Sequence, residues 1–128
     1  MDAIVAANYT TDGEREVLVP AGHTFHMFGV WADEFTNMNI TIDGKIKLSK
    51  RHHKWPVVNE KGNIRDFMMF SDIQNVTFRG EGEVDGQGYM WWVREFLGLN
   101  NMGRPRLVYI RGGRNLEFTG IRWINSPK

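Results

Sequence analysis

A short basic segment with one indole is the first place in the sequence where side chains could bind a ligand. It reads Arg51-His52-His53-Lys54-Trp55. An anionic sugar could be held there, with Arg51 and Lys54 on its carboxylate and Trp55 stacked on its ring. The alternative, which we favour, is an exposed basic loop that Trp55 anchors to the core. A metal is disfavoured because adjacent histidines on an extended segment point to opposite sides, and no cysteine or nearby carboxylate completes a ligand shell.

Three carboxylates at alternate positions form a second candidate. Glu81, Glu83 and Asp85 would project from one face of an extended strand, where they could bind a cation or serve as acid and base. Glycines follow the first and the last of them, which indicates a corner at each end. We therefore interpret this group as a solvated acidic face rather than a metal site.

The composition excludes several kinds of functional site. The chain of 128 residues has no cysteine, which excludes thiolate metal sites, disulfides and cysteine nucleophiles. Sixteen Lys and Arg against fifteen Asp and Glu leave a net charge of +1, and the arginines of residues 104–122 form no continuous basic stripe. No apolar run approaches the roughly 18 residues of a membrane span. We expect no metal, no cofactor, no nucleic acid and no membrane as partners.

A repeated framework must position these candidate residues. Asn followed by an apolar, any and an apolar residue occurs three times, starting at Asn37, Asn75 and Asn115, at intervals of 38 and 40 residues. Intervals of this size are typical of solenoids and propellers. The second and third copies also align at 40 residues in the pairs Phe67 and Leu107, Phe70 and Ile110, Val76 and Leu116, Phe78 and Phe118, and Val84 and Ile124.

Each copy reads as short strands joined by turns. Residues 40–48 alternate apolar and polar types on either side of Asp43-Gly44, which indicates two half-buried strands and a sharp corner. Two longer loops, residues 49–63 and 87–105, interrupt the copies and hold most of the tryptophan. Residues 90–99 predict a short amphipathic helix whose Trp92, Phe96 and Leu99 cover the solenoid. The alternative for these residues is a sugar-binding platform.

The position of the repeated Asn helps to choose the architecture. In a parallel β-helix each coil lies about 4.8 Å above the one below, so an inward Asn at a corner can bond the turn backbone and the Asn of the next coil. An antiparallel sandwich has no reason to place Asn at the same point of each repeat. The remaining alternative is that Asn merely favours turns.

The strings around these repeats resemble the polygalacturonase-like proteins, which are pectin-hydrolysing glycosidases. As an ordered set they are specific, and they cover the chain from about Val17 to its last residue. The strings are Val17-Leu18-Val19-Pro20-Ala21-Gly22, Ile42-Asp43-Gly44-Lys45-Ile46, Trp55-Pro56, Gly80-Glu81-Gly82-Glu83-Val84-Asp85-Gly86-Gln87-Gly88, Trp91-Trp92, Gly103-Arg104-Pro105 and Asn125-Ser126-Pro127.

The resemblance implies an all-β fold, a right-handed parallel β-helix with a short helix near residues 90–99. In such proteins the aspartates of an inverting glycosidase, a His-Gly pair and an Arg-x-Lys motif follow the Asn-Ser-Pro string, and this sequence stops one residue after it. Inverting hydrolysis needs two carboxylates about 6.5–9.5 Å apart, so we assign no catalytic residue. Thr10-Thr11-Asp12-Gly13 looks a little like a catalytic string of the family but precedes the Pro-Ala-Gly landmark.

Domain organisation follows from this framework. We expect a lead-in segment at residues 1–16 and N-terminal coils at residues 17–128, unfinished at the C-terminal end. A solenoid end with open apolar rows and unpaired strand edges needs a cover. That cover would be further coils of the same protein, another subunit or self-association.

Two functional interpretations remain. The chain is either the N-terminal part of a polygalacturonase-like hydrolase, inactive alone and contacting an anionic polysaccharide through residues 51–55, or a non-catalytic β-helix of a larger assembly that serves as a structural or carbohydrate-contacting component. The resemblance favours an extracellular or lysosomal setting. Of the three glycosylation acceptor patterns, only Asn8 is a candidate, and only for a secreted protein.

Overall fold

The computed structural model describes residues 15–58 and 63–128, and within them the strands form three parallel sheets. The first sheet contains β1 (Glu16–Val19), β4 (Thr36–Ile42), β7 (Gln74–Arg79) and β10 (Arg114–Thr119). The second sheet contains β2 (Thr24–Met27), β5 (Lys45–Leu48), β8 (Glu83–Asp85) and β11 (Arg122–Ile124). The third sheet contains β3 (Val30–Asp33), β6 (Met68–Ser71) and β9 (Val108–Arg111).

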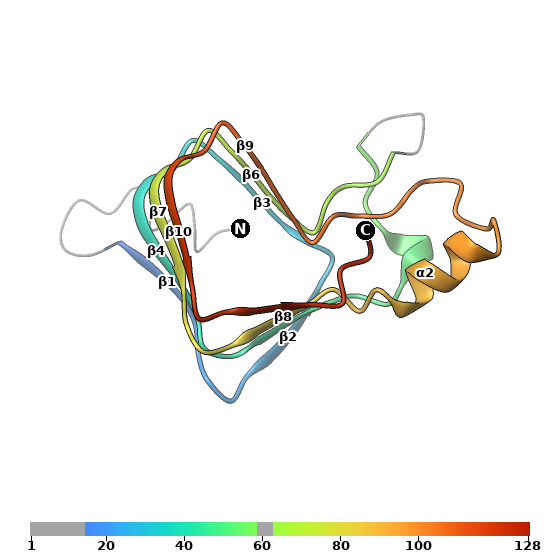
Figure 1. The fold of residues 1–128 in the computed structure, drawn as a ribbon, viewed down its shortest axis with the longest axis horizontal. Helices are drawn as coiled ribbons and strands as arrows, with labels where there is room; N and C mark the ends of the chain where they lie inside the picture. Colours follow the sequence, from blue (N-terminus) through green and yellow to red (C-terminus); the bar gives the residue numbers. More distant parts are fainter. Residues whose placement is uncertain (1–14, 59–62) are drawn as a thin grey trace.

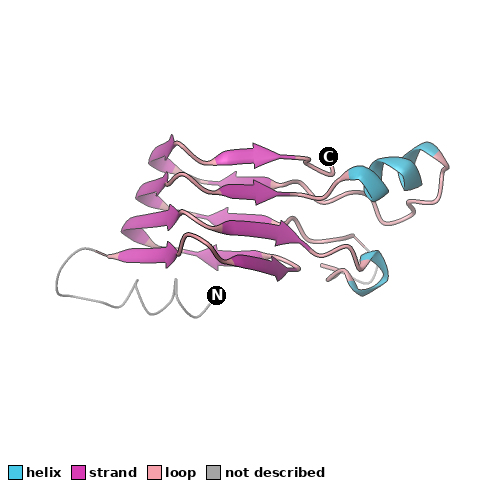
Figure 2. Cartoon of the chain, turned by 90° about the horizontal axis from the view of Figure 1, so that it is seen from below, coloured by secondary structure: helices cyan, strands magenta, loops and turns pink. Residues whose placement is uncertain are grey.

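The chain visits the three sheets in turn and then returns to the first, which makes a parallel β-helix. Figure 1 looks along its axis and shows the three sheets as the sides of a triangle. From β1 onward the chain runs counter-clockwise in that view while it approaches the viewer, which is the right-handed sense. Figure 2 shows the same coils from the side as a stack. The parallel β-helix predicted from the sequence is confirmed.

Strand register explains the repeat and corrects one part of it. Val76 lies beside Leu116 and Phe78 beside Phe118, so the interval of 40 residues holds in the first sheet. In the second sheet, however, Val84 pairs with Trp123 rather than with Ile124. Three residues join β7 to β8 whereas two join β10 to β11, so the shorter turn moves the register by one residue.

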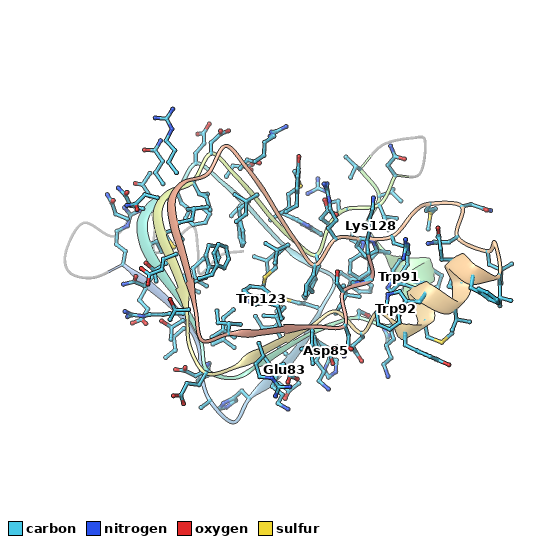
Figure 3. All side chains as sticks on the ribbon, in the orientation of Figure 1. Glu83, Asp85, Trp91, Trp92, Trp123 and Lys128 are labelled. Atoms are coloured by element: carbon cyan, nitrogen blue, oxygen red, sulfur yellow. The ribbon has the colours of Figure 1, made fainter. Side chains whose placement is uncertain are left out.

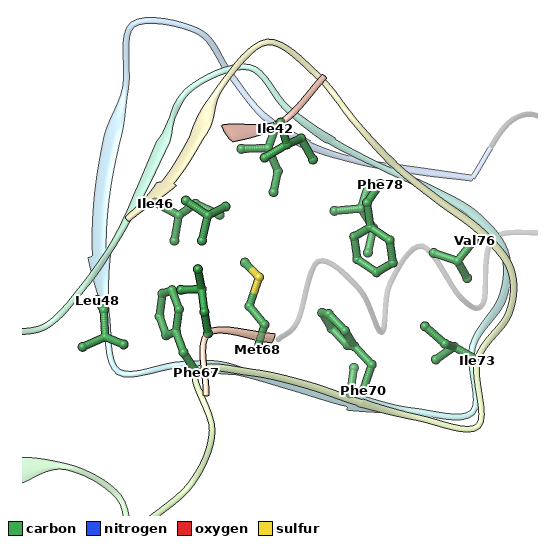
Figure 4. Close-up of a cluster of buried hydrophobic side chains, with 14 of the residues drawn as sticks. Ile42, Ile46, Leu48, Phe67, Met68, Phe70, Ile73, Val76 and Phe78 are labelled. Atoms are coloured by element: carbon green, nitrogen blue, oxygen red, sulfur yellow. The ribbon is translucent and has the colours of Figure 1, made fainter. Parts of the chain in front are cut away.

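The core consists of apolar side chains that point into the triangle and stack from coil to coil. Figure 4 shows the central layers, in which Phe70 and Phe78 meet inside the coil with their rings 5.4 Å apart. Phe78 in turn stacks on Phe118 of the next coil at 4.7 Å and 5°. Burying each such side chain contributes roughly 1.5–3 kcal/mol. Burial is weaker in the last coil, where Phe118 stays 46% exposed.

The repeated asparagines occupy one corner of the triangle, where the chain passes from the third sheet to the first. Asn37, Asn75 and Asn115 have φ angles of 53°, 52° and 49°, in the left-handed region that Asn tolerates better than most residues. Their side chains bond one another from coil to coil. All three residues are exposed. The repeat predicts inward asparagines at this corner, whereas they line its outer edge.

The helix α2 (Tyr89–Phe96) is shorter than the predicted residues 90–99, and it presents a different face to the solenoid. Trp91 is the buried residue of this helix, while Trp92, Phe96 and Leu99 are exposed. The predicted covering face was therefore wrong. The helix extends beside the triangle rather than lying along it, and its first turn is the part nearest the coils (Figure 1), where Trp91 is buried and Trp92 Nε1 donates to the backbone oxygen of Ser126.

Some of the segments singled out in the sequence lie outside the described residues. These are Asn8, residues 10–13 and most of the lead-in segment at residues 1–16. Among the residues that are described, no helix is both long and apolar enough to cross a bilayer.

Candidate functional site

Two adjoining hollows lie along the outer face of the second sheet, where the long loops leave β5 and β8. The first, which we call the basic pocket, measures about 560 Å³ and is lined by His26, Lys47, Ser49, Lys50, Arg51 and Gln87 together with Met27 and Phe28. The second, which we call the indole pocket, measures about 340 Å³ and is lined by Asp85, Gly88, Tyr89, Met90, Trp92 and Asn125 together with Lys50 and Gln87. Because Lys50 and Gln87 line both, the two pockets adjoin, and together we call them the groove.

Strand register builds the floor of the basic pocket. His26 of β2 pairs with Lys47 of β5, and Lys47 pairs with Asp85 of β8, so the three side chains form one outward row across the sheet. The Lys47 Nζ atom lies 4.0 Å from Asp85 Oδ2. Lys50 and Arg51 follow β5 directly and complete the wall. Among the described residues, the lining of this pocket therefore includes three cationic side chains, one of which, Lys47, is paired with Asp85, and an excess of positive charge suits an anion.

The predicted basic segment is only partly in this pocket. Arg51 lines it, whereas His53 and Lys54 are exposed and line neither pocket. Trp55 is 4% exposed, and its Nε1 donates to the backbone oxygen of Arg65 at 2.8 Å. Stacking of Trp55 on a sugar ring is therefore wrong, because the ring is already covered. Its role is the anchoring one named as the alternative.

His52 belongs to an aromatic cluster that joins the loop after β5 to α2. It begins the single-turn helix η1 (His52–Lys54), and its ring meets Trp91 edge to face at 4.7 Å. Trp91 also contacts Trp55 at 5.8 Å, and Trp55 contacts Phe28 at 5.6 Å. Burial lowers the pKa of His52, and the charges of Arg94 and His53 lower it further. Of this cluster only Phe28 lines the groove, in the basic pocket, and the other rings support the wall from behind.

Gln87 connects the two pockets, whereas in the sequence it is only part of the string at residues 80–88 and was not predicted as a site residue. Its φ is 44°, its backbone nitrogen donates to Asp85 Oδ1 at 2.8 Å, and its side-chain amide donates to the backbone oxygen of Leu48. These bonds tie the loop after β8 to the end of β5. Lys47 and Lys50 were also missed from the sequence. Lys50 could have been found beside the basic segment, but placing Lys47 next to His26 requires the strand register.

The acidic strand presents two of its three predicted carboxylates. Glu83 lies 3.9 Å from Lys45 Nζ and 3.4 Å from Arg122 Nη1, and Asp85 accepts hydrogen bonds from Gln87 and Asn125. Glu81 is in the turn before β8. The described residues contain no group of three His, Cys, Asp or Glu able to hold a metal ion. Both strand carboxylates are thus engaged as acceptors by neighbours from adjacent coils.

The fold and the groove together define a parallel β-helix protein with a cationic surface pocket. Its family follows from comparison with known sequences: residues 10–128 match the profile of glycosyl hydrolases family 28, and the chain belongs to that family.

Individual relatives support this. The chain is 29% identical over 118 residues to a probable polygalacturonase of Arabidopsis thaliana, covering 90% of this chain and 23% of that protein. It is 30% identical over 112 residues to a probable endo-xylogalacturonan hydrolase A of Aspergillus fumigatus, covering 87% and 27%. It is 29% identical over 129 residues to the Aspergillus niger protein of that name, covering 98% and 30%. The chain thus spans about a quarter of the length of these relatives.

Proposed function

We propose that this chain forms the N-terminal coils of a polygalacturonase-type hydrolase and binds an anionic polysaccharide of the α-1,4-galacturonan type. The observation that carries the proposal is the basic pocket on the outer face of the second sheet. Membership of family 28 and the names of the relatives supply the substrate class.

The charges of the pocket match a polymer with one carboxylate on every ring. Lys47, Lys50 and Arg51 line the pocket together, and Arg51 offers a planar fork that fits a carboxylate. The described residues pair neither Lys50 nor Arg51 with a carboxylate. Their charge is therefore available to a ligand.

The role that we propose for these coils is binding rather than bond cleavage. An inverting hydrolase needs one carboxylic acid that donates a proton and one carboxylate that activates water. Glu83 and Asp85 are both held as acceptors, against Lys45, Arg122 and Lys47. Neither is placed to donate, so we assign the acid and the base to parts of a longer protein.

Calorimetric titration of the chain with a galacturonic acid hexamer tests this proposal. Since each exposed charge contact is worth about 0.5–1 kcal/mol, the variants Lys47→Gln and Arg51→Gln should each weaken binding roughly two- to five-fold. Higher salt should weaken binding of the unmodified chain as well. Incubation of the hexamer with the chain alone should release no reducing ends.

Lys54→Gln is the matched control, because Lys54 is exposed, lies three residues from Arg51 and lines neither pocket. It should leave hexamer binding unchanged. If the chain does not bind the hexamer, or if Lys54→Gln weakens binding as much as Arg51→Gln, the basic pocket is not the binding site. In the first case the chain serves as a non-catalytic structural component. Turnover by the chain alone would contradict the assignment of cleavage to other parts of the protein.

A further inference from the structure

The two pockets of the groove differ in charge although they share a wall. The basic pocket has three cationic side chains in its lining, whereas the indole pocket has one cation, Lys50, and one carboxylate, Asp85. A second carboxylate that entered the indole pocket would meet Asp85 as well as Lys50. Like charges at close range disfavour binding, so the indole pocket does not repeat the chemistry of the basic pocket.

Trp92 is fixed as an exposed ring at the edge of the indole pocket. Its Nε1 donates to the backbone oxygen of Ser126 at 2.9 Å, yet 42% of the residue is exposed. The preceding Trp91 is buried in the aromatic cluster, so the start of α2 cannot turn to hide Trp92. Figure 3 shows the two indoles on the first turn of α2, beside the chain end at Lys128. A fixed aromatic face loses little entropy when a ring packs on it.

The polar groups that line the indole pocket with this ring are also fixed. Asp85 Oδ1 accepts from Asn125 Nδ2 at 3.0 Å and from the Gln87 backbone nitrogen at 2.8 Å. Gly86 and Gly88 lie so close to the backbone of residues 125–126 that a Cβ on either would clash with it. The residues that end and follow β8 therefore pack tightly against residues 125–126. Asp85 Oδ2 forms an ion pair with Lys47 at 4.0 Å, which is too long for a direct hydrogen bond, so this oxygen can still accept one from a hydroxyl group.

An aromatic face, a carboxylate acceptor and side-chain amides together suit a ring that has apolar C–H bonds on one side and hydroxyl groups on its rim. We propose that the indole pocket binds an uncharged pyranose, packed on Trp92 and hydrogen-bonded to Asp85, next to a charged sugar in the basic pocket. This inference rests on the proposed function. It makes the preferred ligand a polymer in which charged and uncharged rings alternate or adjoin, rather than a uniformly charged one.

Two sources of an uncharged ring share this chemistry: a uronate whose carboxylate is esterified, and a sugar without a carboxylate. Three α-1,4-linked disaccharides with the same ring stereochemistry separate them, namely digalacturonate, its dimethyl ester and digalactose. Each is titrated into chain labelled with ¹⁵N while the five tryptophan indole N–H signals are followed. The Trp92 signal is identified by its loss in Trp92→Phe.

Both uncharged disaccharides should shift the Trp92 signal, with apparent affinities about two- to five-fold above that of digalacturonate, as expected for one unfavourable charge contact. If only one of the two uncharged disaccharides shifts the Trp92 signal, that disaccharide identifies the kind of uncharged ring that the pocket binds. Trp31 supplies the control signal because it lies on the third sheet and lines a different hollow. It should not move.

Asp85→Asn keeps the size of the side chain and removes its charge, so it should bring the affinity of digalacturonate at the Trp92 signal to that of digalactose. Thermal unfolding of Asp85→Asn and Trp92→Phe shows whether either variant is folded. The comparison of the three disaccharides on the unmodified chain does not depend on either variant. The inference is overturned if digalacturonate shifts Trp92 at least as strongly as the uncharged ligands, or if none of the three does. Either result leaves the proposed function intact if Lys47→Gln and Arg51→Gln still weaken hexamer binding.

Discussion

The side-chain nitrogen of Asn75 lies 2.9 Å from the side-chain oxygen of Asn37, one coil below it. The same arrangement recurs one coil above, where the Asn115 nitrogen lies 2.7 Å from the Asn75 oxygen. Each residue also has a positive φ. Asn75 therefore stabilises the corner in two ways, because it joins three coils and because it adopts a backbone conformation that most residues resist.

Substitution of Asn75 separates these two contributions. Asn75→Gly loses both side-chain bonds but keeps the backbone conformation, which should lower the free energy of unfolding by about 1 kcal/mol for two exposed hydrogen bonds. Asn75→Ala also strains the backbone, which should raise the loss to about 2 kcal/mol. Urea unfolding followed by circular dichroism measures both values. Equal losses in the two variants would show that the positive φ contributes nothing.

A second prediction concerns the contact between coils at the turn before β8. Gly82 is buried, and a Cβ there would collide with the backbone oxygen of Gly44 in the coil below. The oxygen belongs to the backbone and the alanine Cβ is bonded directly to the backbone, so neither atom can rotate away, and Gly82→Ala should destabilise the chain by about 1–3 kcal/mol. Urea unfolding at constant pH measures the change.

Gly98→Ala is the control for this substitution. Gly98 has a φ of 66°, and no atom lies within 4 Å of the place that a Cβ would occupy, so alanine there meets backbone strain alone. Its loss should be about 1 kcal/mol. A smaller loss for Gly82→Ala than for Gly98→Ala would mean that the coils can separate at little cost.

How much of this fold the sequence could predict depends on the range of the interactions. The alternation around residues 40–48, the glycine corners and the spaced Asn37, Asn75 and Asn115 are local or periodic features, and they predict strands, turns and coil stacking. The pairing of Val84 with Trp123 is neither local nor periodic, because it depends on the length of one turn relative to another. A single residue fewer in that turn was enough to make the extrapolated register wrong.

The site was harder to predict for the same reason. Contiguous charge singles out residues 51–55 in the sequence, but the structure directs Trp55 inward and leaves His53 and Lys54 outside the pocket. The remaining cations come from neighbouring strands and become a cluster only through parallel pairing. Helical periodicity likewise failed for α2, because the helix meets the coils at one end, through Trp91, rather than along a face.

A third prediction concerns the attachment of α2 to the coils. Trp91 is 1% exposed and packs on His52 and Trp55, so Trp91→Ala should lower the free energy of unfolding by about 3–5 kcal/mol. Phe96, on the same helix, is 90% exposed, and Phe96→Ala should change it by less than about 0.5 kcal/mol. Urea unfolding of both variants tests the contrast. Comparable losses would mean that α2 is not attached through Trp91.

The last prediction concerns the pH dependence of the same cluster. The pKa of His52 lies below its ordinary value of 6.5, chiefly because the ring is partly buried and also because Arg94 and His53 are nearby. The unfolded chain therefore binds a proton near pH 6.5 that the folded chain binds only at lower pH. Stability from the neutral ring is fully present above pH 6.5 and declines as the pH falls from there toward the folded pKa.

Replacing His52 by phenylalanine keeps an aromatic ring against Trp91 and removes the titration. Urea unfolding at several values between pH 4.5 and 8 measures the free energy of unfolding of both chains. Below about pH 6.5 the value for the unmodified chain should fall relative to that for His52→Phe, and above it the two curves should stay parallel. His53→Gln changes only the exposed neighbour. The loss of stability at low pH should largely remain in this variant, because burial is the main cause of the lowered pKa of His52. If the curves of the unmodified chain and His52→Phe stay parallel throughout, the His52 ring does not resist protonation in the folded protein.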